Sequence, residues 1–405
     1  MLGLSLEGGG AKGSYQFGAW KAFRELGVEF DGITGTSIGA LNGALMVQED
    51  YEKAHEIWHE IAPEKVLNVD SKLYNMIMET GIKSDQIQFI LEQAQRFVKD
   101  AGLDIGPLVK MIREGTKEDR IRQSNKDFGF VTVSLTDLKP LELFKEEVPK
   151  GKMADYLLAS SYLPIFKPEK IDGKTFLDGG FYNNLPINML YQKGYKKVVA
   201  VRLMSKGRIK KLSFEDLEVI YIQPKHDLGN ILDLSKEKAM YNINLGYYDT
   251  LKAFKNFHGE NYYLTEGIED REGIEFLQEL KQDTIEKISD LLGLTQSLPK
   301  NRVVLEELVP KLIQLLGCRE EVSYGELVLK LFEEIAAYEK VELFKIYSLK
   351  EFLEEINHRE VTEKKQVDTL FLNSALLLRF NKDKVLEHLI RIILTSEEKI
   401  QIKKT

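Results

Sequence analysis

The sequence predicts an α/β fold with a mainly parallel central sheet, followed by an all-helical domain. Short apolar runs alternate with helical periodicity over the first 265 residues, which is typical of a parallel sheet covered by helices on both faces. From residue 266 onward, apolar residues recur at helical spacing among dense charges. The length of 405 residues exceeds the usual size of one domain. We therefore expect residues 1–265 and 266–405 to form separate domains.

Six short apolar runs predict the strands of the sheet. They are Leu2–Leu6, Phe30–Thr34, Phe130–Ser134, Thr175–Leu177, Lys197–Leu203 and Glu218–Ile222. Helical spacing between them, as in Tyr15–Leu26, predicts the covering helices, because parallel strands are buried on both faces. The stretch 62–127 is helical in pattern and more polar. It is either a helical insertion close to the functional site or an ordinary crossover packed on the sheet.

The C-terminal part contains six stretches with the apolar spacing of helices. They are Asp270–Leu292, Arg302–Leu316, Tyr324–Tyr338, Ser348–His358, Thr369–Phe380 and Val385–Leu394. We expect their apolar stripes to pack against one another as the core of a bundle. Cys318 is the only cysteine, so the chain forms no intrachain disulfide and has no cysteine cluster for a metal.

Two glycine-rich corners follow the first two predicted strands. They are Gly8-Gly9-Gly10-Ala11-Lys12-Gly13 and Gly35-Thr36-Ser37-Ile38-Gly39. A reactive serine on a sharp strand-to-helix turn needs neighbours without Cβ atoms, which Gly35 and Gly39 supply. If Ser37 attacks a carbonyl, negative charge develops on its oxygen, and exposed backbone N–H groups stabilise that charge. The candidate donors are the N–H groups of Gly8, Gly9, Gly10 and Ile38.

The first corner by itself has a second interpretation. Gly8-x-Gly10-x-x-Gly13 also fits the fingerprint of dinucleotide-binding folds, with Glu29 and Asp31 near the expected ribose position. A third corner, Phe176-Leu177-Asp178-Gly179-Gly180, favours hydrolysis because it places a carboxylate at the end of a predicted strand. Taken alone, Asp178 could be an ordinary turn residue.

Together the three corners resemble the patatin-like phospholipase family. Its pattern is a Gly-Gly-Gly-x-Lys/Arg-Gly segment, a Gly-x-Ser-x-Gly elbow and an Asp-Gly-Gly/Ala turn. In this sequence Lys12 and Gly13 complete the first motif, and Gly179 and Gly180 complete the third. The stretches Ala159–Phe166 and Asn183–Pro186 add to the likeness. It is strong over residues 2–200 and fades toward Leu264.

The resemblance implies a patatin-like three-layer α/β/α fold and a lipid acyl hydrolase of the phospholipase A or lysophospholipase type. It implies a dyad of Ser37 and Asp178 without histidine, an acyl-enzyme intermediate and no cofactor. Its substrate would be a phospholipid or another acyl lipid. Two other functions stay open: a catalytically silent lipid-binding or scaffolding protein with the same fold, and a dinucleotide-binding oxidoreductase.

Two groups of histidines offer competing sites. His55-Glu56-Ile57-Trp58-His59 reads as a zinc motif, with Glu79 as a third ligand, but both histidines flank the apolar helix face. We therefore predict no metal. His226 or His258 could complete a triad with Ser37 and Asp178, yet neither follows a strand in a recognisable turn. Without histidine, Asp178 needs burial to raise its pKa above the ordinary value near 3.9.

Composition limits the partners and the location. A net charge of −8 disfavours nucleic acid but does not forbid peripheral contact with a membrane surface. No signal peptide is expected, because Glu7 interrupts the first apolar run. No run approaches the roughly 18 apolar residues of a spanning helix. We expect a cytoplasmic protein, with homo-oligomerisation left open.

Overall fold

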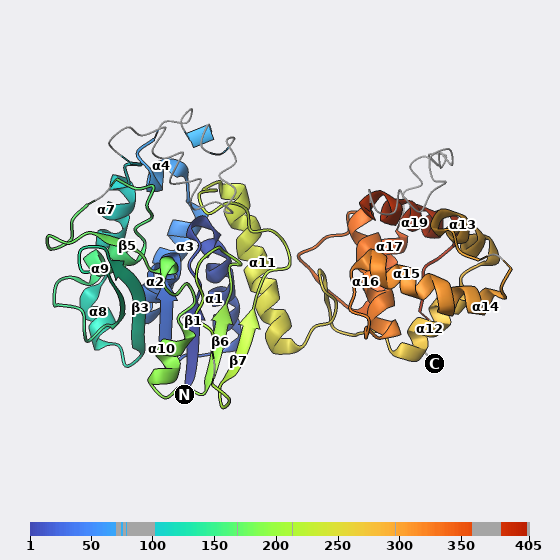
Figure 1. The fold of residues 1–405 in the computed structure, drawn as a ribbon, viewed down its shortest axis with the longest axis horizontal. Helices are drawn as coiled ribbons and strands as arrows, with labels where there is room; N and C mark the ends of the chain where they lie inside the picture. Colours follow the sequence, from blue (N-terminus) through green and yellow to red (C-terminus); the bar gives the residue numbers. More distant parts are fainter. Residues whose placement is uncertain are drawn as a thin grey trace. The chain divides into compact units, whose positions relative to one another are not determined.

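The computed structural model describes residues 1–69, 74–75, 78, 102–167, 169–212, 214–295, 297–358 and 382–402. These residues divide into two compact units, Met1–Lys255 and Asn256–Thr405 (Figure 1). The first unit therefore ends before residue 265, where the sequence placed its domain boundary. The domain limits themselves stay a prediction.

A mainly parallel sheet forms the centre of the first unit. Its path is β4-β3-β2-β1-β6-β7, and β5 also pairs with β3, which gives seven strands among the described residues. The strands are β1 (Leu2–Leu6), β2 (Gly32–Thr36), β3 (Asp127–Ser134), β4 (Lys139–Phe144), β5 (Phe176–Asp178), β6 (Lys197–Val201) and β7 (Glu218–Ile222). Only β4 and β5 run antiparallel to their neighbour β3. The predicted fold class is confirmed.

The strand β4 is absent from the sequence prediction. Its segment Lys-Pro-Leu-Glu-Leu-Phe carries charges and a proline, which suit an edge strand rather than a buried one. Apolar spacing predicts the second strand over Phe30–Thr34, whereas β2 lies over Gly32–Thr36. The difference arises because Gly35 and Thr36, which belong to the glycine-rich corner in the sequence, still pair with β3.

Helices cover both faces of this sheet. They are α1 (Ser14–Leu26), α2 (Ile38–Val47), α3 (Tyr51–His59), α4 (Pro63–Val66), α7 (Gly106–Gly115), α8 (Glu118–Gln123), α9 (Met153–Ser160), α10 (Ile187–Gln192) and α11 (Lys236–Lys255). Gly43 of α2 faces Ile33, whereas the neighbouring Gly32 faces Tyr195 just after α10. Because successive strand residues point to opposite faces, α2 and α10 lie on opposite sides of the sheet.

The long helix α11 packs directly along α1 (Figure 1). A Cβ atom at Gly18 would lie 1.9 Å from the carbonyl oxygen of Ile243, and one at Gly246 would lie 2.0 Å from that of Tyr15. Only glycine permits this close approach of two backbones. The contact fixes the first helix after the glycine-rich corner Gly8–Gly13.

The region predicted as a helical insertion, 62–127, lies partly outside the described residues. Its described parts contain α4, α7 and α8. Leu103 forms an isolated bridge to Phe166, which ties the segment before α7 to the chain after α9. The choice between an insertion and a crossover therefore stays open.

The second unit has its own apolar core. Its helices are α12 (Asp270–Glu279), α13 (Gln282–Leu292), α14 (Lys300–Arg302), a π-helix (Val303–Leu308), α15 (Val309–Leu316), α16 (Tyr324–Tyr338), α17 (Leu349–Asn357) and α19 (Lys382–Ser396). The stripes expected to form a core do so, with Leu277, Val304 and Phe332 among the fully buried side chains. The predicted helix 369–380 lies outside the described residues.

The second unit is not wholly helical. Strand β8 (Tyr263–Leu264) pairs in parallel with β9 (Ile346–Tyr347). The loop before β8 is held by Glu333, a carboxylate only 1% exposed, which accepts backbone N–H bonds of 2.8 Å from Asn261 and Tyr262. Two-residue strands give too short an alternation to be found from sequence. Over the described residues, no helix has the length and apolarity needed to cross a bilayer.

Candidate active site

Ser37 lies on the sharp turn between β2 and α2. Its backbone has φ 55° and ψ −126°, a conformation that is strained for a residue with a side chain. A Cβ atom at Gly35 would lie 2.3 Å from the carbonyl oxygen of Gly39, and one at Gly39 equally close to that of Leu6. The two glycines therefore allow the chain to reverse tightly around Ser37. The serine itself is 7% exposed.

A second serine holds this turn in place. The Ser37 N–H donates to the hydroxyl of Ser160 over 3.0 Å, and that hydroxyl donates to the carbonyl of Val131 over 2.6 Å. Ser160 thus links the turn to β3. Sequence patterns do not point to this role, since Ser160 lacks the flanking glycines that mark a functional turn.

Pairing along β3 explains why Ser37 and Asp178 come together. Strand β2 pairs with β3 up to Thr36 opposite Val131. Strand β5 runs the other way on the same edge and ends with Asp178 opposite Thr132. The two strand ends therefore meet at adjacent residues of β3. A Cβ at Gly179 would lie 2.2 Å from the Val131 carbonyl oxygen, so the chain can turn there only with glycine.

Asp178 is a buried carboxylate with one hydrogen-bonded oxygen. Its side chain is 4% exposed, and Oδ1 accepts the Gly180 N–H over 2.7 Å. Burial raises the pKa of Asp178 from 3.8 to about 6, although the Ser37 hydroxyl and the Gly180 N–H act to lower it. The other oxygen, Oδ2, is buried and has no hydrogen-bond partner within the described residues. This oxygen can therefore accept a proton.

The three glycines after β1 do not offer equivalent N–H groups. The Gly8 N–H donates to the backbone oxygen of Asn184 over 3.1 Å, so it is already used. The N–H groups of Gly9, Gly10 and Ile38 form no hydrogen bond with the described parts of the chain. Each stands at the beginning of a helical turn, where N–H groups lack intrahelical partners. Gly8 is therefore removed from the candidate oxyanion-hole donors, which leaves the N–H groups of Gly9, Gly10 and Ile38.

Asn184 orients the peptide that carries one of these donors. Its Nδ2 donates to the Gly8 carbonyl oxygen over 3.1 Å. In a trans peptide the C=O and N–H point in opposite directions, so this bond sets the direction of the Gly9 N–H. Asn184 thus joins the chain after β5 to the glycine loop.

A buried ion pair lies behind the same loop. Glu7 is fully buried, and its Oε2 accepts bonds from Arg202 Nε at 2.8 Å and from the Leu203 N–H at 2.7 Å. Lys12 is also buried rather than solvated, at 6% exposure. Burial lowers the pKa of Lys12, while Asp227 and Glu7 act to raise it. The glycine loop is therefore flanked by a buried carboxylate at Glu7 and contains a buried lysine at Lys12.

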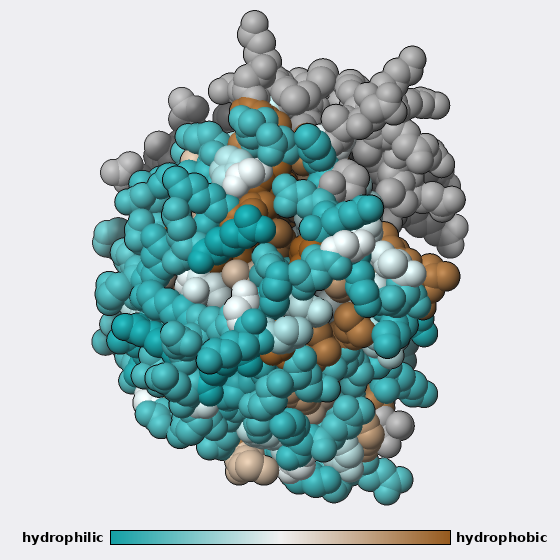
Figure 2. All heavy atoms as spheres, turned by 90° about the vertical axis from the view of Figure 1, so that its left-hand side faces the viewer, coloured by the Kyte–Doolittle hydropathy of each residue, from teal (hydrophilic) through white to brown (hydrophobic). Residues whose placement is uncertain are grey.

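A largely apolar cavity of about 120 Å³ opens beside Ser37. Its walls come from α2, α3, α4, α7 and α9 and from the loop at Ile231–Leu234. None of the residues that line it is charged. Figure 2 views the first unit from one side, where hydrophobic side chains show as a band between hydrophilic ones. The site thus combines a strained serine, a buried carboxylate and an apolar chamber.

Residues 4–191 match the patatin-like phospholipase family. The first unit contains a patatin-like phospholipase domain. It is 28% identical over 222 residues to Patatin-like phospholipase domain-containing protein 7 of Mus musculus, covering 53% of this chain and 14% of that protein. It is 29% identical over 221 residues to Lysophospholipase NTE1 of Kluyveromyces lactis, covering 53% and 13% respectively.

The matched part of the chain thus spans about one seventh of the length of these relatives. Among solved structures, VipD from Legionella pneumophila is similar at 14% identity and a TM-score of 0.37, covering 98% of this chain and 84% of that one. A TM-score this low carries no argument. The fold of the patatin-like domain therefore rests on its own strand pairing.

The patatin-like domain does not have the geometry of a dinucleotide-binding site. In that arrangement the acidic residue lies at the carboxyl end of the second strand, near the glycine loop. Here Asp31 precedes β2 and accepts the Leu2 N–H over 2.7 Å at the start of β1. Because β1 and β2 are parallel, Asp31 lies at the opposite edge of the sheet from Gly8–Gly13.

The histidines are placed away from this chemistry. His55 and His59 stack on each other with ring centroids 3.7 Å apart. The described residues hold no group of three His, Cys, Asp or Glu side chains suited to a metal, and Glu79 lies outside them. His226 packs against Tyr241, and His258 belongs to the second unit. None of these histidines lines the cavity of the patatin-like domain.

Proposed function

We propose that the patatin-like domain is a serine esterase that hydrolyses acyl lipids, with Ser37 as nucleophile and Asp178 as base. The observation that carries the proposal is the meeting of β2 and β5 on β3, beside an uncharged cavity. It brings a serine on a nucleophile elbow to a buried carboxylate with a pKa raised to about 6. The family match and the lysophospholipase named among the relatives agree with this activity.

In the first half of the reaction, Asp178 Oδ2 accepts the proton of the Ser37 hydroxyl as its oxygen attacks the ester carbonyl. The N–H groups of Gly9, Gly10 and Ile38 form the oxyanion hole. The tetrahedral intermediate collapses as protonated Asp178 gives its proton to the leaving alcohol. This step leaves the acyl group on Ser37 and returns Asp178 to the carboxylate form.

In the second half, water replaces the alcohol. Asp178 takes a proton from the water, which attacks the acyl carbonyl, and then returns that proton to the Ser37 oxygen. A base is most effective when its pKa lies near the working pH. The raised pKa of Asp178 suits this role better than the ordinary value, since an aspartate at 3.8 would hold an abstracted proton too weakly.

Ser37→Ala tests the nucleophile. We expect it to abolish hydrolysis of p-nitrophenyl esters and labelling by a fluorophosphonate, because it removes the attacking oxygen and leaves the fold in place. Ser289→Ala is the matched control, since Ser289 is also buried but belongs to the second unit. It should be labelled like wild type. Undiminished labelling of a folded Ser37→Ala protein would refute the proposal.

A further inference from the structure

The segment Lys206–Lys211 lies next to the proposed reaction centre. It follows β6, and the parallel strands β1, β2 and β6 place their carboxyl ends at one edge of the sheet, which is the edge of Ser37. The Arg208 N–H donates to the Gly180 carbonyl oxygen over 2.9 Å, and the Asn184 N–H donates to the Arg208 carbonyl oxygen over 2.6 Å. The segment is therefore held directly against the chain that follows β5.

This segment is a local concentration of positive charge on an acidic protein. Four of its six residues are lysine or arginine and none is acidic, although the whole chain has a net charge of −8. Lys210 pairs with Glu142 of β4 at 2.7 Å. The side chains of Arg208 and Lys211 are exposed and form no hydrogen bond or ion pair with any residue that the structure describes. Two cations therefore stay free to contact an external anion.

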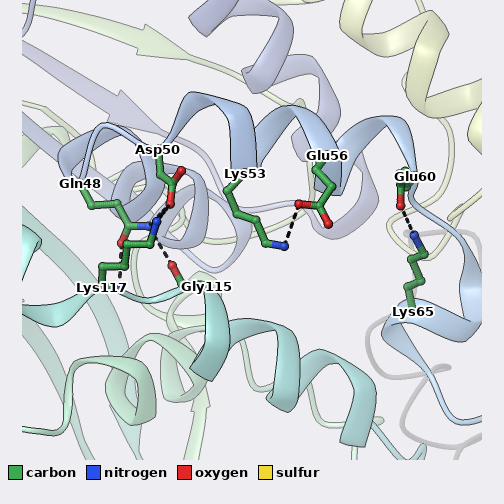
Figure 3. Close-up of polar contacts among 8 residues, drawn as sticks. All are labelled: Gln48, Asp50, Lys53, Glu56, Glu60, Lys65, Gly115 and Lys117. Atoms are coloured by element: carbon green, nitrogen blue, oxygen red, sulfur yellow. Dashed lines mark hydrogen bonds and ion pairs between the residues drawn. The ribbon is translucent and has the colours of Figure 1, made fainter.

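The lysines around α3 differ in this respect. Each lysine drawn in Figure 3 lies against a carboxylate. The pairs are Lys53–Glu56, Lys65–Glu60 and Lys117–Asp50. Because opposite charges at short range cancel, these lysines contribute little net potential at the surface. The free charges of Arg208 and Lys211 are therefore a particular feature of the chain after β6.

Two exposed apolar side chains lie at the same edge of the sheet. Leu138, in the turn between β3 and β4, is 85% exposed, and Met204, in the chain after β6, is 54% exposed. Both have a positive φ, 52° and 48°, which large side chains rarely adopt. Strand β3 pairs with Thr36 at Val131 and continues to Ser134, so the Leu138 turn extends about 10 Å beyond β2. Neither side chain is needed for the core.

We propose that Lys206–Lys211, Leu138 and Met204 form a docking surface for anionic lipid bilayers. The negative potential of an anionic leaflet attracts lysine and arginine, while apolar side chains enter the boundary between headgroups and acyl chains. The choice of a lipid surface as the partner rests on the proposed function, because Ser37 lies at the same edge. The docking surface adds to that function a preference for anionic membranes.

Vesicle sedimentation with the Ser37→Ala protein tests docking without turnover. The vesicles contain phosphatidylcholine alone, or phosphatidylcholine with about one third phosphatidylglycerol. We expect at least tenfold stronger binding to the anionic vesicles, and loss of this difference when NaCl is raised from about 0.05 M to about 0.5 M, since salt screens exposed charges. Equal binding to both vesicles would overturn the inference. Binding to neither would also overturn it, whether or not the protein binds polyglutamate as a model of an acidic partner.

Arg208→Gln/Lys211→Gln, made in the same inactive protein, removes both free cations. Each basic side chain near an anionic leaflet strengthens binding by about fivefold, so we expect at least tenfold weaker binding to the anionic vesicles. The matched control is Lys53→Gln/Lys197→Gln, which removes the same charge from lysines that already pair with carboxylates. It should bind within about threefold of its parent. Equal losses in both double variants would overturn the inference, because net charge alone would then explain binding.

Leu138→Asn and Met204→Asn test the apolar part of the surface. Asparagine tolerates a positive φ better than leucine or methionine, so we expect no loss of fold stability. Each variant should weaken vesicle binding at least threefold, because it removes apolar area that the bilayer would bury. Tyr221→Thr is the control, since Tyr221 is 45% exposed on the edge strand β7. Unchanged binding in both folded asparagine variants would overturn this part of the proposal.

The results separate this inference from the proposed function. If Ser37→Ala binds anionic vesicles as described but wild type hydrolyses no ester, the esterase proposal fails and the docking surface stands. If wild type hydrolyses soluble esters through Ser37 but vesicle binding is insensitive to Arg208→Gln/Lys211→Gln, the docking surface fails alone.

Discussion

At the scale of single residues, the environment of Asp178 determines its basicity. Its Oδ1 accepts the Gly180 N–H, while Oδ2 is buried without a hydrogen-bond partner among the described residues. A carboxylate in water would be too weak a base, but removal from solvent disfavours its charged form and raises its pKa to about 6. The same burial that raises the pKa of Asp178 makes its charged form costly for the folded state.

The activity should depend on the ionised form of Asp178. Since the base must be deprotonated, we expect kcat/KM for a soluble ester to be lost as the pH falls through about 6, the pKa of Asp178 in the folded protein. Rate measurements between pH 4 and 9 would show this limb. A limb near pH 4 would mean that Asp178 is not the titrating base.

Asp178→Asn should remove activity, whereas His226→Ala should stay within a few-fold of wild type. Only a carboxylate at the end of β5 can take the Ser37 proton, while His226 packs on Tyr241. Steady-state rates with octanoate esters measure both effects. A loss of a hundredfold or more in a folded His226→Ala protein would instead favour a triad.

Asp178→Asn should also raise the free energy of unfolding at high pH. The unfolded chain releases the Asp178 proton near pH 3.8, but the folded protein keeps it up to about pH 6, so stability falls over that window and stays lower above it. Asp178→Asn avoids this loss of stability. The rise in pKa from 3.8 to about 6 corresponds to about 3 kcal/mol, because one pKa unit is worth 1.36 kcal/mol. Urea unfolding at pH 8 should show the gain. No such gain is expected below pH 3.8.

At the scale of elements, the site depends on loops that are fixed to one another. The turn after β2 is tied to β3 through Ser160, and the glycine loop after β1 is tied to the chain after β5 through Asn184. These bonds set the direction of backbone N–H groups as well as the position of side chains. Donors aimed in advance at the oxyanion need no reorganisation during the reaction.

Asn184→Ala tests this arrangement. The Gly8–Gly9 peptide loses the bond that orients the Gly9 N–H, so we expect kcat to fall roughly tenfold to a hundredfold with little change in KM. Asn183→Ala is the control, because its amide bonds to Asn188 instead of the glycine loop. Measuring kcat and KM separately for each variant distinguishes Asn184→Ala from Asn183→Ala. Equal losses in both variants would indicate a general weakening of the corner.

At the scale of the whole molecule, each unit buries its own apolar residues. The stripes of the C-terminal helices that could have served a lipid surface are used in the core of the second unit. Each of the three glycine-rich corners lies within residues 1–255. The patatin-like domain therefore holds every residue that the proposed reaction uses.

Removal of residues 256–405 should leave the chemistry in place. We expect a protein ending at Lys255 to hydrolyse soluble esters within a few-fold of the full chain and to be labelled at Ser37. Vesicle hydrolysis should change by the same factor, because the helical stripes are buried. Circular dichroism checks the fold of the shorter chain. A selective loss on vesicles would show that the second unit serves the lipid surface.

Much of both units could be predicted from local patterns. The strand β1 and the helix α16 have the limits that apolar spacing indicates, because each has a strong and uninterrupted pattern. The edge strand β4 and the pair β8 and β9 could not be found, since they depend on pairing partners distant in sequence. The break between α12 and α13 was also missed, as apolar spacing continues across it.

The amino-acid sequence identifies the candidate reactive residues and the positions where the chain turns. Gly35 and Gly39 specify a tight reversal around Ser37, and the glycines after Asp178 specify another, because a Cβ atom would collide with backbone there. The requirement at Gly35 is local, since the clashing carbonyl belongs to Gly39. A Cβ atom at Gly39 or Gly179 would instead meet the carbonyl of Leu6 or Val131, which only folding brings close.

Which hydrogen-bond donors stay free, and which carboxylates are buried, follows from the folded structure alone. The Gly8 N–H is taken by Asn184, distant in sequence, and the burial of Asp178 comes from strands that meet on β3. The cavity likewise needs walls from five helices and a loop. Desolvation and the use of hydrogen-bond donors depend on what surrounds a group, and sequence spacing carries no record of those surroundings.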